Sequence, residues 1–194
     1  MRTLRDITLG EFASTFVPFV VLLVAAMWAA EATLELTRFR LIYSVWVSLA
    51  FAIPALYLFV RSDRSPRATA YWVLCWTFSF LAYLVHFYFA VFRVYHGSLA
   101  AMYWKQGPLI ATSNLVVTAL WTADVALAWL SDRDASWIRV EQVVAHGAVA
   151  LTFFVSGVLI FGGFARVLGL LMTAAVAWGL LRRIDLRRAE AARA

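Results

Sequence analysis

The side chains that could do chemistry are few, and they lie inside apolar runs. The chain contains three histidines and one cysteine, and His86 interrupts the apolar and aromatic run LAYLVHFYFAVFRVYHG at residues 81–97. Asp124 and His146 interrupt two later apolar runs in the same way. Because an ionisable group is expensive in lipid, each of these side chains is a functional hypothesis, with proton transfer, ion binding and haem ligation as the chemistries to weigh.

Helical spacing groups the polar side chains on stripes. At about 100° per residue, small and polar residues share one face in each of the segments 69–92, 108–131 and 137–161. The stripes hold Cys75, Ser79, Ala82, His86, Ala90 and Arg93, then Ser113, Asn114, Thr118, Trp121, Thr122 and Asp124, then Arg139, Gln142, His146, Ala150, Phe153 and Gly157. Such stripes face other helices rather than lipid, so we expect these side chains to point into a bundle.

A helical rise of about 1.5 Å per residue predicts two polar clusters at different depths. The outer cluster would hold His86, Asn114, Arg93, His96 and Gln106. The inner cluster would hold Asp124, His146, Arg139, Glu141 and Gln142. We expect His86 to hydrogen-bond to Asn114, and Asp124 to pair with His146, because a buried carboxylate is tolerable only when it is partnered.

Haem b or a quinone is the cofactor that the histidines could serve, and His86, His96 and His146 are the candidate binding residues. A bis-histidine haem needs two imidazoles on facing helices at similar depth. His86 and His146 differ by roughly half a bilayer, and His86 and His96 are about 15 Å apart along one helix axis. Haem ligation therefore needs a partner of another residue type or from another chain, and a quinone headgroup stays open near His86.

No catalytic motif is found, so the sequence does not decide whether the protein is an enzyme. Three isolated histidines cannot fill the clustered sites of non-haem iron or zinc membrane enzymes, and no protein metal site is predicted. The single Cys75 excludes an intrachain disulfide or a redox pair. Protease motifs and a glycine-rich phosphate loop are also missing from the sequence.

The composition places these residues in a membrane. Hydrophobic residues make up 64% of the 194, charged residues 14%, and the mean hydropathy is +0.81, whereas soluble domains are about 45–50% apolar and about 25% charged. Six apolar segments are each near the ~20 residues that a crossing helix needs: 12–30, 41–60, 69–92, 108–131, 137–161 and 164–181. We predict an all-α integral membrane protein, with residues 1–194 forming one bundle of about six transmembrane helices.

Three details of this bundle follow from local signals. Gly162 and Gly163 predict a tight turn between the last two helices, and the count falls to five if they mark only a kink. The stretch GSLAAMYWKQG predicts a short helix along the membrane surface. Aromatic residues near the span ends predict two interfacial belts, among them Trp28, Tyr71, Trp72, Tyr95, Tyr103, Trp104, Trp129, Trp137 and Trp178.

Charge sets the expected orientation. The net charge is +6, and twelve of the seventeen basic residues fall on one side if the N-terminus is inside. Cytoplasmic loops collect Arg and Lys, so we predict a multi-pass protein of the bacterial inner membrane with both termini cytoplasmic. The twelve residues are Arg2, Arg5, Arg61, Arg64, Arg67, Arg133, Arg139, Arg182, Arg183, Arg187, Arg188 and Arg193. The membrane explains the basic balance, and no nucleic-acid partner is expected.

Two functional hypotheses remain. Small residues at helix-packing spacing, such as Ser44 and Ser48, together with the missing catalytic motif, favour an accessory, structural or cofactor-anchoring subunit of a larger membrane complex, including a redox complex. Its partners would be lipid and other subunits or copies of itself. The alternative is a small proton- or cation-coupled transporter that uses Asp124 and His146. The intramembrane polar network would also include Ser79, Asn114, Thr118, Arg139 and Gln142.

Overall fold

Helices make up almost all of the described chain. The computed structural model describes residues 7–61, 65–131 and 135–191, and no strand occurs within these ranges. The α-helices are α1 (Leu9–Glu31), α2 (Leu36–Arg61), α3 (Pro66–Tyr88), α4 (Leu99–Gln106), α5 (Pro108–Leu130), α6 (Ser136–Phe154) and α7 (Phe164–Ala191). Two π-helical segments continue α3 and α6, namely η2 (Phe89–Val94) and η3 (Val155–Ile160).

Six helical stretches of the described chain are long and apolar enough to cross a membrane. They are Leu9–Glu31, Leu36–Arg61, Pro66–Val94, Pro108–Leu130, Ser136–Ile160 and Phe164–Leu186. The predicted all-α bundle and its six spans are therefore confirmed. Gly163, with a φ of +60°, lies in the turn between η3 and α7, so the glycine pair separates two helices rather than kinking one. The short α4 occupies the stretch predicted as a surface helix.

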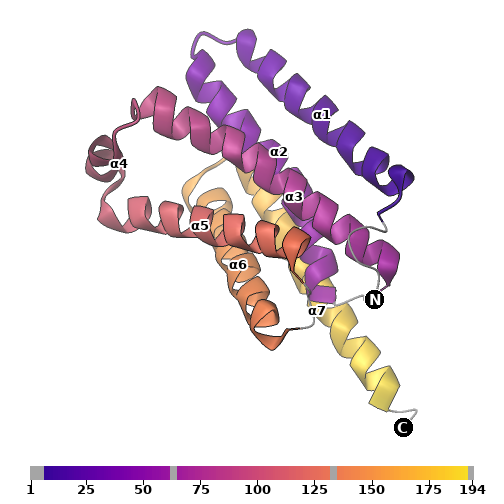
Figure 1. The fold of residues 1–194 in the computed structure, drawn as a ribbon. Helices are drawn as coiled ribbons and strands as arrows, with labels where there is room; N and C mark the ends of the chain where they lie inside the picture. The colour runs from indigo at the N-terminus through magenta and orange to yellow at the C-terminus, as the bar shows by residue number, and fades with distance from the viewer. Residues whose placement is uncertain (1–6, 62–64, 132–134, 192–194) are drawn as a thin grey trace.

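The helices α2 and α3 form the middle of the bundle (Figure 1). Helix α1 packs along one side of this pair, α7 packs against α2, and α5 and α6 pack together on the other side. One apolar core joins these parts, because each spanning helix contributes a buried side chain to it: Phe19, Leu56, Trp76, Trp121, Val149 and Met172. The short α4 lies at the end of the bundle where α3 passes to α5.

The two ends of the bundle differ in what they hold. Helix α1 starts, α2 ends, α3 starts and α7 ends toward one end, which we call the terminal end (Figure 1). The opposite end, with α4, is the distal end. At the terminal end, α1 begins with a capping box in which the Thr8 side chain accepts a hydrogen bond from the Glu11 N–H and the Glu11 carboxylate accepts one from the Thr8 N–H.

Part of the charge pattern falls outside the described residues. This holds for Arg2, Arg5, Arg64, Arg133 and Arg193. The described residues Arg61, Arg67 and Arg139 lie at helix ends on the terminal side, which is consistent with the predicted grouping of basic residues.

Glycine permits close packing between the two helices of the last hairpin. Gly157 of η3 lies against Gly169 of α7, and a Cβ at Gly169 would sit 2.9 Å from Val158 Cγ2 and 3.3 Å from the Gly157 carbonyl carbon. Such contacts leave no room for a methyl group. Gly147 of α6 differs, because nothing lies within 4 Å of a Cβ placed there.

We predict that Gly169→Ala destabilises the protein by about 1–3 kcal/mol, because the added methyl group overpacks the hairpin. Gly147→Ala is the matched control and should be neutral or stabilising by about 0.5–1 kcal/mol, since alanine favours a helix. Thermal unfolding of both variants in the same detergent measures the difference. Equal shifts in the two variants would show that the hairpin is looser than described.

Candidate functional site

His146 of α6 is enclosed by the bundle and is only 1% exposed. Its imidazole lies between the rings of Phe59 on α2 and Trp76 on α3, with ring centroids 3.9 Å away on both sides. The interplanar angles of 17° and 11° make both contacts stacked. Two flat partners hold the plane of the imidazole, so its nitrogens can point only along the gap between the two rings.

Hydrogen bonds to the two ring nitrogens define the tautomer of His146. Trp72 Nε1 donates to His146 Nε2 over 3.0 Å. An indole N–H is a donor only, so Nε2 carries no proton and the proton lies on Nδ1. From Nδ1 the N–H donates to the Gln142 carbonyl oxygen at 2.8 Å, and Asp124 Oδ2 lies 3.5 Å away. The imidazole is therefore neutral in this arrangement.

Asp124 of α5 is fully buried beside this imidazole. Its Oδ2 accepts a hydrogen bond from Trp76 Nε1, the same indole that stacks on His146 with its face. Asp124 and His146 are thus neighbours, but the Nδ1 proton of His146 is directed to the Gln142 carbonyl oxygen rather than to the carboxylate. Trp76 joins the two groups, because its face covers the imidazole while its N–H satisfies the carboxylate.

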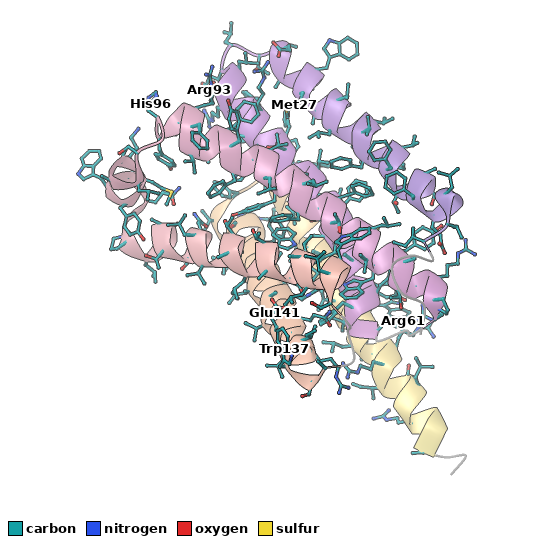
Figure 2. The ribbon with its side chains drawn as sticks, viewed as in Figure 1. Met27, Arg61, Arg93, His96, Trp137 and Glu141 are labelled. Carbon is teal, nitrogen blue, oxygen red and sulfur yellow. The ribbon has the colours of Figure 1, made fainter. Side chains whose placement is uncertain are left out.

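Glu141 of α6 adds a second carboxyl group, and its side chain interacts with that of Asp124. Figure 2 shows Glu141 near the start of α6, close to Trp137. Both carboxyl oxygens of Glu141 are enclosed, and neither accepts a hydrogen bond from an N–H or O–H of the described residues. Two ionised carboxylates can only accept, so this pair becomes hydrogen-bonded when one of them holds a proton. Of the five residues predicted for the inner cluster, Asp124, Glu141 and His146 come together, and from here on the name inner cluster refers to these three.

The other residues predicted for the inner cluster contribute less. Gln142 is buried, but it is its backbone carbonyl that contacts His146, and its side-chain Nε2 is enclosed without a hydrogen-bond partner in the described chain. Arg139 is exposed and does not enter the cluster.

Sequence reasoning missed the two indole donors of this site. Trp72 was expected to anchor in the interface, but it is 8% exposed, and Trp76 is fully buried. The signal was present, because positions 72, 76 and 79 follow helical spacing and place both indoles on the stripe that carries Ser79. A tryptophan on a polar stripe is a candidate buried donor rather than an anchor.

The outer polar residues divide into separate contacts. His86 Nδ1 lies 2.9 Å from the Leu41 carbonyl oxygen of α2, so the expected hydrogen bond to Asn114 is wrong. The Asn114 amide instead donates to Gln106 Oε1 at 3.0 Å, and Gln106 Nε2 donates to the Tyr95 hydroxyl at 2.8 Å. The reason is packing, because α3 lies along α2 more extensively than along α5.

Two further residues of the predicted network join helix pairs. Ser79 Oγ donates to the Ser48 carbonyl oxygen at 2.7 Å, and Ser48 Oγ donates to the Ser79 carbonyl oxygen at 2.9 Å, which ties α2 to α3. The hydroxyls of Tyr83 and Thr118 are 2.7 Å apart and join α3 to α5. These contacts satisfy polar groups between helices and hold the helices that carry the inner cluster.

The structure does not bring the three candidate cofactor histidines together. His96 is exposed, with a φ of +52°, in the turn after η2. Figure 2 shows it near Arg93, at the opposite end of the bundle from Glu141. Both nitrogens of His146 are occupied, so this residue could ligate a haem only if it lost the Trp72 hydrogen bond or the Gln142 contact. Among the described residues, no group of three or more His, Cys, Asp or Glu is arranged to hold a metal ion.

Fold and site together define a multi-pass helical membrane protein with a buried histidine–carboxylate cluster. Comparison of the chain with protein-family models, with curated proteins and with solved structures finds no match.

We predict that Trp72→Phe destabilises the protein by about 1–3 kcal/mol, because it leaves the buried Nε2 of His146 without its donor. The matched control is Trp129→Phe, which removes an exposed indole hydrogen bond of 2.9 Å to Thr77 Oγ1. The control should shift stability by less than about 1 kcal/mol, since water replaces the lost partner. Denaturant unfolding in detergent compares the two, and equal losses would argue against a special role for the buried bond.

Proposed function

We propose that this protein is a small proton-coupled carrier of the bacterial inner membrane, in which the inner cluster binds and releases the coupling proton. One observation carries the proposal: the buried Asp124 carboxyl group, the half-buried Glu141 carboxyl group and the buried neutral imidazole of His146 lie together on the membrane-spanning helices α5 and α6. Ionisable groups at such depth are expensive, and they typically mark proton relays and ion pathways.

The carboxyl pair is suited to hold a variable number of protons. When Asp124 and Glu141 are both ionised, they repel each other in surroundings of low dielectric constant. A single proton shared between them removes the repulsion and makes a hydrogen bond. Binding and release of that proton therefore change the interaction between α5 and α6 directly.

His146 can convert proton binding into helix movement. A second proton on its ring would sit on Nε2 and would turn that nitrogen into a donor. The Trp72 N–H, now 3.0 Å from Nε2, would then face another donor. The hydrogen bond between α3 and α6 would be lost, and the imidazolium would be drawn toward the two carboxyl groups. This is a two-state contact of the kind that coupled transport requires.

The location of the cluster supports proton exchange with the cytoplasm. Asp124 precedes the end of α5 by six residues, which is about 9 Å at the helical rise. His146 lies ten residues after the start of α6, which is about 15 Å. Both helix ends belong to the terminal end, and the excess of Arg there favours the cytoplasmic side.

We predict that the purified protein shows an infrared carbonyl band of a protonated carboxyl group at neutral pH, and that Glu141→Gln and Asp124→Asn each remove or shift it. The physical reason is that neutralising one member of the pair leaves no shared proton. Glu35→Gln is the matched control, because Glu35 is exposed and its carboxylate lies 2.7 Å from Arg38 at the distal end. Its variant should keep the band unchanged.

The same variants test coupling in sealed proteoliposomes that contain a pH-sensitive dye. A panel of cations and small organic ions is added one by one. With the wild-type protein, a transported solute should change the pH of the lumen. Asp124→Asn should abolish this pH change. An unchanged carbonyl band in both inner-cluster variants would overturn the shared-proton proposal, whatever the transport result.

An accessory subunit of a larger membrane complex is the second candidate, and helix α1 favours it. Only 11% of the residues in its most apolar stretch are buried by the rest of the chain. Its outward side carries exposed apolar side chains, including Val17, Val21, Val24 and Trp28. Lipid would cover this face, and a partner subunit would cover it equally well.

Gentle purification of the tagged chain separates the two candidates. An accessory subunit should bring partner proteins at fixed stoichiometry, and a cofactor-anchoring subunit should show a Soret band in the visible spectrum. A carrier should purify colourless, alone or as a homo-oligomer. Val21→Trp on α1 should reduce the recovery of partners several-fold if α1 is the docking face, while Val143→Trp on the exposed side of α6 should not.

A further inference from the structure

A groove opens between the end of α2 and the start of α3, and it is lined by side chains other than those of the inner cluster. Its volume is about 390 Å³, and the side chains that matter to its chemistry are Pro54, Leu58, Arg61, Arg67, Tyr71 and Cys75. It lies at the terminal end of the bundle, where Figure 2 marks Arg61.

Helical spacing orders the groove from polar to apolar with depth. On α2 the positions 61, 58 and 54 differ by three and four, so Arg61, Leu58 and Pro54 follow one face inward from the helix end. On α3 the positions 67, 71 and 75 differ by four, so Arg67, Tyr71 and Cys75 do the same from the helix start. Both rows therefore place a guanidinium at the membrane surface and an apolar group about two turns deeper.

The polar mouth is partly organised by Tyr71. The Arg67 guanidinium lies over the Tyr71 ring at 5.7 Å, and the Tyr71 hydroxyl is 3.1 Å from Ser14 Oγ on α1. The ring thus holds Arg67 over the groove while α1 holds the ring. The guanidinium also interacts with the Tyr71 hydroxyl. Because a guanidinium has five N–H donors, the others can bind an anion.

We infer that this groove binds one anionic phospholipid of the cytoplasmic leaflet. Its phosphate would lie at Arg61 and Arg67, and the start of an acyl chain would lie on Pro54, Leu58 and Cys75. The order of groups along the groove matches the order of groups in a lipid, and arginine suits phosphate because it offers several N–H donors in one plane. Basic pockets between spanning helices on the cytoplasmic side are suited to anionic headgroups.

A free phosphate ion would use only the mouth of the groove. The apolar lower half favours a lipid, because exposed apolar surface between helices is covered at low cost by a hydrocarbon chain. The inference rests on the proposed orientation but not on proton coupling, so it can hold when the carrier proposal fails.

The test is the thermal stability of the whole purified chain in a neutral detergent. Phosphatidylglycerol, phosphatidylcholine and inorganic phosphate are titrated separately. We expect phosphatidylglycerol alone to raise the midpoint of unfolding. Arg67→Gln should lower the apparent affinity for phosphatidylglycerol, read from this titration, about fivefold, which is the usual effect of one basic residue near an anionic membrane surface. Arg67 is exposed, so the substitution should leave the fold intact.

Arg139→Gln is the matched control, because it removes the same charge from the same end of the bundle but from α6, outside the groove. It should respond to phosphatidylglycerol like the wild type. Equal stabilisation by phosphatidylcholine would overturn the proposed headgroup specificity. Equal stabilisation by inorganic phosphate would overturn the lipid and leave an anion site. Equal losses in the two variants would place the lipid elsewhere.

Discussion

The rest of the structure depends on one constraint, which is that a carboxylate and an imidazole inside a membrane bundle need polar partners. Trp76 and Trp72 supply these partners by donating to Asp124 and His146. Because the two indoles lie one turn apart on α3, that helix must lie between α5 and α6 on one side and α2 on the other. Phe59 then closes the second face of the imidazole from α2. Satisfying two buried groups thus links four helices at one point.

Close packing between α2 and α3 supports this arrangement. The reciprocal hydrogen bonds of Ser48 and Ser79 join the two helices, with small side chains that let the backbones approach. The same approach brings the Leu41 carbonyl oxygen within 2.9 Å of His86. Near the terminal end the two helices carry Arg61 and Arg67, and the groove opens there. One helix pair therefore carries a packing function and a proposed lipid site, while the ionisable groups of the proposed proton site lie on α5 and α6.

Much of the architecture could be predicted from the sequence, because hydropathy and helix length need no tertiary information. Six spans, the Gly162–Gly163 turn and the short helix α4 all follow from composition and local turn signals. The proximity of Asp124 to His146 was also predictable, since both lie on inward-facing stripes at similar depth. The prediction of Trp72 as an interfacial residue was wrong, because the side chain is buried. An aromatic residue near the end of a span is typical of a membrane anchor, and only its neighbours in the bundle show otherwise.

The sequence by itself determined the apolar spans and the inward direction of Ser79, Asp124 and His146, because helical periodicity and the cost of polar groups in lipid act locally. Ser113, Thr122 and Arg93 lie on the same predicted stripes but are exposed. Only the tertiary structure decided which side chains of different helices contact each other. It gave His86 a carbonyl of α2 rather than Asn114, and it placed Glu141 against Asp124. Those choices depend on the distances and rotations between helices, which arise from packing over the whole bundle and which no single helix encodes.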